Sequence, residues 1–149
     1  MKMKRMVCAL LCAALSVCLF GCGKKAEVPI EEYVWALESA LQHSLDGRVI
    51  ACSEGYAEGI DDEGVQILSC IMTASDGKYS IVDKTDDLSF AGEYELYEAV
   101  KDSASYHLTT NNGHGVAITG KVTYADGSQA RTLIVRFGDY TLNFFELLA

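Results

Sequence analysis

The sequence has few of the residues that build reactive centres and nucleic-acid interfaces. It contains three histidines, one proline and one tryptophan, and its 12 Lys and Arg residues are outnumbered by 21 Asp and Glu residues, for a formal net charge of −9. A surface this acidic repels phosphate backbones, so nucleic acid is excluded as a partner. The chain also lacks the HExxH, GxSxG and glycine-rich phosphate-loop motifs, and none of the catalytic centres that these motifs define is expected.

The three histidines, His43, His107 and His114, lack the spacing of metal ligands, and neither a metal nor a cofactor is expected. His107 is predicted to face solvent from a strand. Cys70 lies in the apolar run ILSCIM, where burial would raise the pKa of its thiol and oppose a nucleophilic role. We therefore expect no enzyme; the alternative is a site assembled from residues distant in sequence, for example His107 with an acidic neighbour.

A long hydrophobic run is also missing. The uncharged run from Met6 to Phe20 is shorter than the roughly 20 apolar residues that span a bilayer. It follows a cationic patch made by Lys2, Lys4 and Arg5. A short apolar run after a cationic patch is typical of a cleaved export signal.

Four residues end this run: Leu19, Phe20, Gly21 and Cys22. They resemble the lipobox of bacterial lipoproteins, although Phe20 departs from the smaller residue usual there. The resemblance implies that residues 1–21 are removed and that the Cys22 thiol carries a diacylglycerol, which anchors the chain to the extracytoplasmic face of the cell membrane or the outer membrane. Residues 22–28 then form a short tether to the membrane, and residues 29–149 form a single globular domain.

Removal of the signal would also divide the six cysteines among the signal, the lipid anchor and the folded domain. Cys8, Cys12 and Cys18 would leave with the signal and Cys22 would take the lipid, so Cys52 and Cys70 remain for the folded domain. In an exported domain such a pair forms a disulfide or stays as two buried thiols, and the sequence leaves both open.

The first element of the domain is predicted to be a helix over residues 29–45. Pro29 suits a first helical position, and Asp46-Gly47 suits a helix end. Apolar residues recur at three- and four-residue spacing, which predicts one buried stripe: Ile30, Val34, Leu37, Leu41 and Leu45. Trp35 falls on the opposite side of this helix, where it would contact a partner or a membrane interface, or pack under a loop.

Strands separated by turn dipeptides follow the helix. Asp76-Gly77 and Gly138-Asp139 are predicted to be two-residue turns of hairpins. A similar turn at Asp126-Gly127 would point Val116 and Ile118 inward. The expected fold is therefore α+β: an N-terminal amphipathic helix packed on an antiparallel meander of about six or seven strands, shaped as a cupped sheet or, alternatively, a lipocalin-like barrel.

These features predict a lipid-anchored envelope protein with a non-enzymatic binding domain. A small ligand would lie on a concave sheet face lined by Tyr94, Tyr106, Tyr124 and Phe144. A protein partner would instead contact an exposed apolar patch, for which Trp35 is the candidate. An inhibitor or immunity-type protein is a special case of partner binding.

Overall fold

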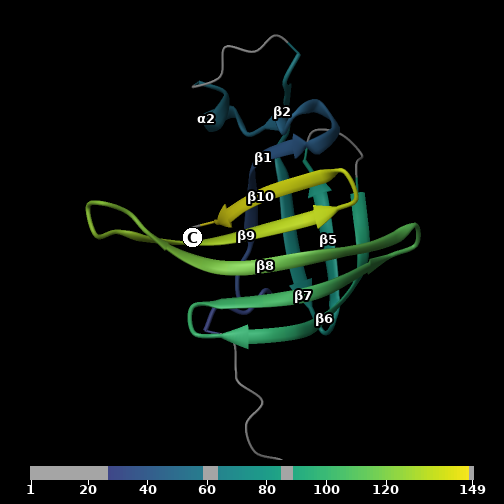
Figure 1. Cartoon of the computed structure of the whole chain (residues 1–149), viewed down its shortest axis with the longest axis vertical. Coiled ribbons are helices and arrows are strands. Elements are labelled where there is room, and N and C mark those ends of the chain that lie inside the picture. Colours follow the sequence, from purple (N-terminus) through teal and green to yellow (C-terminus); the bar gives the residue numbers. More distant parts are fainter. Residues whose placement is uncertain (1–26, 59–63, 85–88, 148–149) are drawn as a thin grey trace, which may run out of the picture.

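The computed structural model describes residues 27–58, 64–84 and 89–147, and most of these residues lie in β-strands (Figure 1). No helix in these ranges is long and apolar enough to cross a bilayer. The elements, in chain order, are β1 Trp35–Gln42, the 3₁₀ helix η1 His43–Leu45, β2 Arg48–Cys52, the helix α2 Glu54–Ala57, β3 Gln66–Ile67, β4 Cys70–Ser75, β5 Lys78–Asp83, β6 Ser89–Val100, β7 Ser103–Thr110, β8 Gly113–Thr123, β9 Gln129–Phe137 and β10 Tyr140–Glu146.

The strands close into a barrel. From β4 to β10 each strand pairs with the next in antiparallel fashion, and β1 pairs with β10 on one side and with β4 on the other. These contacts make an eight-stranded antiparallel barrel, to which β2 and β3 add as an extension at β1. The expected α+β fold is therefore wrong. Closure pairs edge backbone groups that a cupped sheet would leave exposed.

The predicted helix over residues 29–45 is wrong, because its central part, Trp35–Gln42, is the strand β1 in the barrel wall. Trp35, Leu37 and Ala40 are buried, and the register against β10 shifts between Leu37 and Ser39. This bulge interrupts the two-residue alternation of inward side chains, so the pattern of a strand is not visible in this part of the sequence. Two residues of the predicted apolar stripe, Val34 and Leu45, are exposed.

The segment of residues 27–34 closes one end of the barrel, here called the closed end. The side chains of Val28 and Ile30 are fully buried in the barrel core. Thr119 Oγ1 donates to the Val28 carbonyl at 2.6 Å, and the Ile30 N–H donates to Tyr106 Oη at 3.1 Å. The expected tether of residues 22–28 therefore ends inside the barrel, at Val28.

The turn predictions have mixed outcomes. The two-residue turns at Asp76-Gly77 and Gly138-Asp139 are confirmed by the pairs Ser75–Lys78 and Phe137–Tyr140. The turn around Asp126-Gly127 is longer than predicted, because Thr123 pairs with Gln129.

This longer turn changes the register of β8 by one residue. A one-residue change exchanges the two faces of a strand. The predicted inward residues Val116 and Ile118 are consequently exposed, and their neighbours Ala117 and Thr119 are buried in the barrel.

Candidate ligand-binding site

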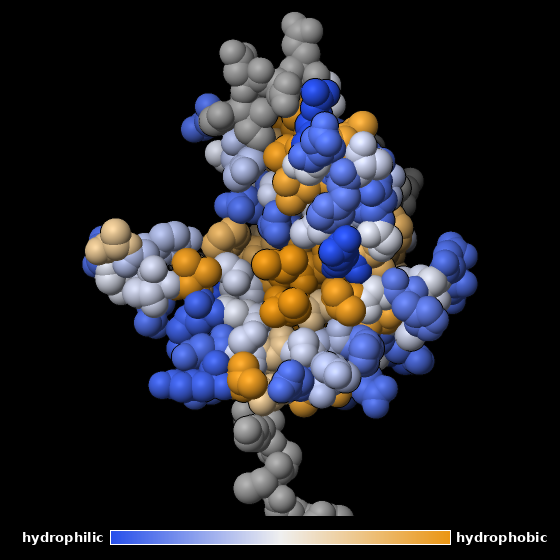
Figure 2. Space-filling view, in the orientation of Figure 1, coloured by the Kyte–Doolittle hydropathy of each residue, from blue (hydrophilic) through white to orange (hydrophobic). Residues whose placement is uncertain are grey.

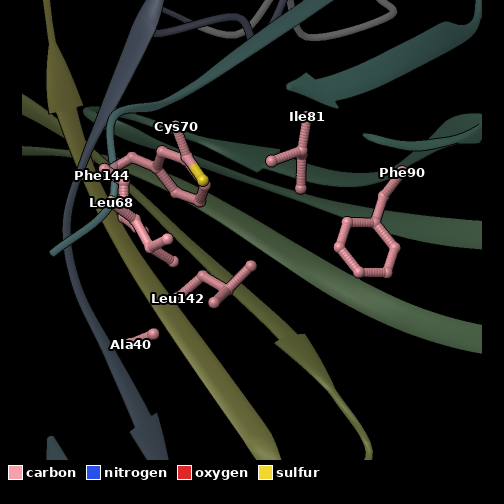
Figure 3. Close-up of a pocket in the computed structure, with 8 residues that line it drawn as sticks. Ala40, Leu68, Cys70, Ile81, Phe90, Leu142 and Phe144 are labelled. Atoms are coloured by element: carbon pink, nitrogen blue, oxygen red, sulfur yellow. The ribbon is translucent and has the colours of Figure 1, made fainter. Parts of the chain in front are cut away.

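An apolar cavity lies inside the barrel at the end opposite residues 27–34, and we call it the barrel hollow. Its volume is about 90 Å³. Eight side chains line it: Leu37 and Ala40 of β1, Leu68 from the segment before β4, Cys70 of β4, Ile81 of β5, Phe90 of β6, and Leu142 and Phe144 of β10. Figure 3 shows Ile81 and Phe90 on one side of the hollow, facing Leu68, Leu142 and Phe144.

The barrel hollow forms where β1 and β4 diverge. These two strands pair only at Trp35–Met72 and Ala36–Ile71. Beyond that point β1 pairs with β2, starting at Ser39, and no longer with β4. The gap that results is filled incompletely by Leu68 and Cys70, which leaves the cavity.

Phe90 marks the mouth of the barrel hollow. It pairs with Ile81 across the β5–β6 ladder, and 56% of its surface is exposed. Because an aromatic ring so exposed gains little from burial within this chain, it is available to cover a bound apolar group.

Cys70 is the one ionisable group among the eight side chains that line the barrel hollow, but it is not activated. Burial and the nearby Asp83 carboxylate raise the pKa of its thiol to about 11. The thiol is therefore protonated at neutral pH and is a poor nucleophile. Cys70 and the fully buried Cys52 are both free, so the disulfide considered for this pair does not form.

Only one of the four residues predicted to line a ligand face, Phe144, lies in the barrel hollow. Tyr94 and Tyr106 are at the closed end, where their rings meet edge to face at 5.8 Å. Tyr94 Oη donates to the Glu31 carboxylate, and Tyr106 Oη accepts from the Ile30 N–H. These two tyrosines therefore bind the N-terminal segment of their own chain, and that segment occupies the predicted ligand face.

Tyr124, the fourth predicted residue, is outside the barrel. It lies at the turn of the β8–β9 hairpin, which extends beyond the barrel in Figure 1, and 46% of its surface is exposed.

Trp35, predicted as a partner contact, is instead among the fully buried side chains of the core. Its indole N–H donates to the Ile30 carbonyl at 2.8 Å, and its ring meets the Tyr33 ring at 5.5 Å. The expected exposure of Trp35 is wrong, since it depended on the helix that does not form. Cys22, the predicted lipidation site, lies outside the described residues.

None of the histidines that the structure describes lines the barrel hollow. His107 lies on the outer side of β7, where its ring meets the Tyr97 ring at 4.8 Å and its strand partner is Glu95. His43 Nε2 is 2.8 Å from Thr141 Oγ1, and His114 is exposed on β8. Across residues 27–58, 64–84 and 89–147, no group of three or more His, Cys, Asp or Glu side chains is placed to hold a metal ion.

Apolar side chains also gather on the outside of the barrel. Val116, Ile118 and Ile134 are exposed, and Ile118 is the direct strand partner of Ile134. Figure 2 shows this outer patch as a group of orange side chains near the middle of the face over β8 and β9. It is a second candidate surface, and the register change in β8 is the reason that sequence reasoning missed it.

Sequence reasoning also missed most of the barrel hollow. Apolar and polar residues alternate along β6 and β10, and this alternation indicates that Phe90 and Leu142 face inward. For these two residues the sequence therefore carried a usable signal. Leu37, Ala40 and Leu68 had no such signal, because the first two lie beside a β-bulge and the third precedes β4.

Comparisons with protein-family models, with curated proteins and with solved structures find no match to this chain.

Proposed function

We propose that this chain is a lipid-anchored protein of the bacterial envelope that binds a small apolar group in the barrel hollow and catalyses no reaction. The observation that carries the binding role is a cavity lined almost entirely by apolar side chains at the end of the barrel that residues 27–34 do not fill. The lipid anchor is proposed from the lipobox-like residues that end at Cys22.

The size of the barrel hollow limits what it binds. Its volume of about 90 Å³ is below the roughly 150 Å³ of an engineered cavity that binds benzene, and below the roughly 300–1,000 Å³ of pockets for drug-sized ligands. It suits the end of a narrow chain. Each CH₂ buried there contributes about 0.8 kcal/mol, so the barrel hollow alone supports only weak binding.

The proposed anchor also orients the barrel. Residues 22 to 28 span at most roughly 22 Å when extended, and Val28 is already buried at the closed end. The closed end therefore stays beside the bilayer, and the mouth at Phe90 faces away from it. On this proposal the ligand arrives from the aqueous side.

The test uses Cys70 as a reporter, because it lines the barrel hollow. Decanol should slow the alkylation of Cys70 by iodoacetamide at pH 9, measured by peptide mass spectrometry. Ala40→Leu adds a side chain to the hollow and should remove this protection. Ala91→Leu makes the same change on an exposed residue of β6 and should retain it. Protection that is absent in the unaltered chain, or unchanged by Ala40→Leu in a variant that still unfolds cooperatively, would refute the binding role.

A second candidate function is contact between the outer patch and another envelope protein. The exposed Ile118–Ile134 pair favours it, since a patch of this kind commonly marks an interface. Ile118→Lys should abolish crosslinking of the lipidated chain to such a partner and leave the decanol protection of Cys70 unchanged. Crosslinking that survives this variant would exclude the outer patch as the contact.

A further inference from the structure

A larger groove adjoins the barrel hollow, and we call it the side groove. Its volume is about 390 Å³, and it lies where β1 diverges from β4, with β3 and α2 on its far side. Three residues line both cavities: Leu37, Leu68 and Cys70. The two cavities therefore share a wall formed by these side chains, and a ligand that occupies both would pass between them.

The walls of the side groove are held by backbone hydrogen bonds. The Ser53 N–H donates to the Glu38 carbonyl at 2.9 Å, and the Leu68 N–H donates to the Cys52 carbonyl at 2.9 Å. The Lys84 N–H donates to the Ser69 carbonyl at 3.2 Å. The groove is therefore formed before any ligand binds, which lowers the free-energy cost of binding.

The two cavities differ in chemistry. The barrel hollow is apolar, whereas Ser53, Glu54, Ser69 and Lys84 line the side groove. The Lys84 ammonium and the two serine hydroxyls can donate hydrogen bonds, against a single carboxylate, that of Glu54. This balance favours a ligand head rich in acceptor oxygens, and the ammonium favours a negative one.

We propose that the two cavities form one site for a single-chain amphiphile with a carboxylate head. The end of the acyl chain enters the barrel hollow, the chain passes Leu68 and Cys70, and the carboxylate lies in the side groove beside Lys84. This inference rests on the proposed binding function, and it supplies the polar contact that the small hollow lacks.

The test compares three probes of equal chain length, decanoate, decanol and decylammonium. The full-length chain is held in vesicles of a zwitterionic lipid, and the alkylation of Cys70 at pH 9 is followed by peptide mass spectrometry. At this pH the carboxylate of decanoate is charged. Because partition into the vesicles is the same for every variant, differences between variants report on the site itself.

Lys84→Gln should raise the decanoate concentration that gives half-protection about threefold, the effect that one partly exposed ion pair allows. The same variant should leave protection by decanol unchanged. Lys101→Gln removes a lysine from the turn between β6 and β7, outside both cavities, and should change neither value.

Two outcomes would overturn the carboxylate assignment while leaving apolar binding in place: equal protection by decanoate in the Lys84→Gln and unaltered chains, or stronger protection by decylammonium than by decanoate. If no probe protects Cys70 in any variant, the binding role itself is refuted and this inference with it.

Discussion

Trp35 joins the N-terminal segment to the barrel. Its ring is fully buried in the core, and its N–H satisfies the carbonyl of Ile30, another fully buried residue. Truncating a large buried aromatic residue leaves a cavity, and here it also leaves a carbonyl without its donor.

We predict that Trp35→Ala lowers the free energy of unfolding by about 3–5 kcal/mol. Urea unfolding followed by circular dichroism measures this. Tyr124→Ala, at the exposed turn of the β8–β9 hairpin, is the matched aromatic control and should change stability by less than about 0.5 kcal/mol. A small loss for Trp35→Ala would contradict the burial of this ring.

Tyr94 makes the free energy of unfolding depend on pH in the alkaline range. Burial, followed by its hydrogen bond to the Glu31 carboxylate, raises the pKa of its phenol from 10.0 to about 12. Because the folded state holds the proton more tightly than the unfolded state, the stabilisation is complete below pH 10. It is lost as the pH rises from 10 towards 12.

We predict that Tyr94→Phe reduces the loss of stability between pH 10 and about 12, the window set by the pKa of Tyr94. Denaturant unfolding at several pH values measures this slope. Some slope should persist, because burial also raises the pKa of Tyr106 and that of Tyr79. An identical slope in the variant would show that Tyr94 titrates alike in the folded and unfolded states.

At the scale of elements, β6 depends on a glycine that faces the barrel interior. A Cβ atom at Gly92 would lie 1.9 Å from the Thr109 carbonyl oxygen and 2.9 Å from the Tyr79 ring. Tyr79 is a buried core residue that stacks against Phe137 at 6.4 Å. The absence of a side chain at Gly92 therefore leaves the space that the Tyr79 ring occupies.

We predict that Gly92→Ala destabilises the barrel by about 1–3 kcal/mol, the usual cost of overpacking a core. Gly120→Ala is the control, since its nearest neighbour would be Thr132 Oγ1 at an ordinary 3.6 Å. Thermal unfolding of the two variants side by side measures the difference. Equal unfolding midpoints would mean that β6 moves away from Thr109 and Tyr79 at little cost in free energy.

How well each element could be predicted depends on whether its signal is local. Asp76-Gly77 specifies its turn by its own backbone preferences, because Asp76 and Gly77 both adopt positive φ, and that hairpin was predicted correctly. The turn at 124–128 contains the similar pair Asp126-Gly127 but has a longer loop, closed by the Tyr124 N–H to the Ser128 carbonyl. Turn chemistry alone therefore left the register of β8 undetermined.

β1 is an element that local sequence preference predicts wrongly. Its apolar residues satisfy a helical period, yet β1 pairs with β10, β2 and β4, and the hydrogen bonds and burial from three strands outweigh a weak local preference. The bulge near Leu37 that shapes the barrel hollow exists only within those pairings.

At the scale of the whole molecule, the barrel has two unlike ends. One is filled by residues 27–34, and the other contains the barrel hollow and opens at Phe90. The proposed lipid on Cys22 would hold the filled end at the membrane.

We predict that Cys22→Ser releases the chain from the membrane fraction and leaves its mass without the lipid increment, because a thiol is needed for that attachment. Fractionation and intact-mass measurement check this. Cys52→Ser, which alters a buried thiol of the fold, is the control and should keep both the lipid and the membrane location. A Cys22→Ser chain that stays lipidated and membrane-bound would contradict the anchor.

The sequence by itself determined what depends on composition and on neighbouring residues: the acidic charge and the hairpins at Asp76-Gly77 and Gly138-Asp139. The tertiary structure alone decided the closure of β1 on β10, the burial of Trp35, the occupation of the tyrosine face by residues 27–34 and the position of the barrel hollow. The physical reason is range, since a turn is stabilised within a few residues, whereas closing a barrel pairs strands about a hundred residues apart and rewards only the register that buries both of their inner faces.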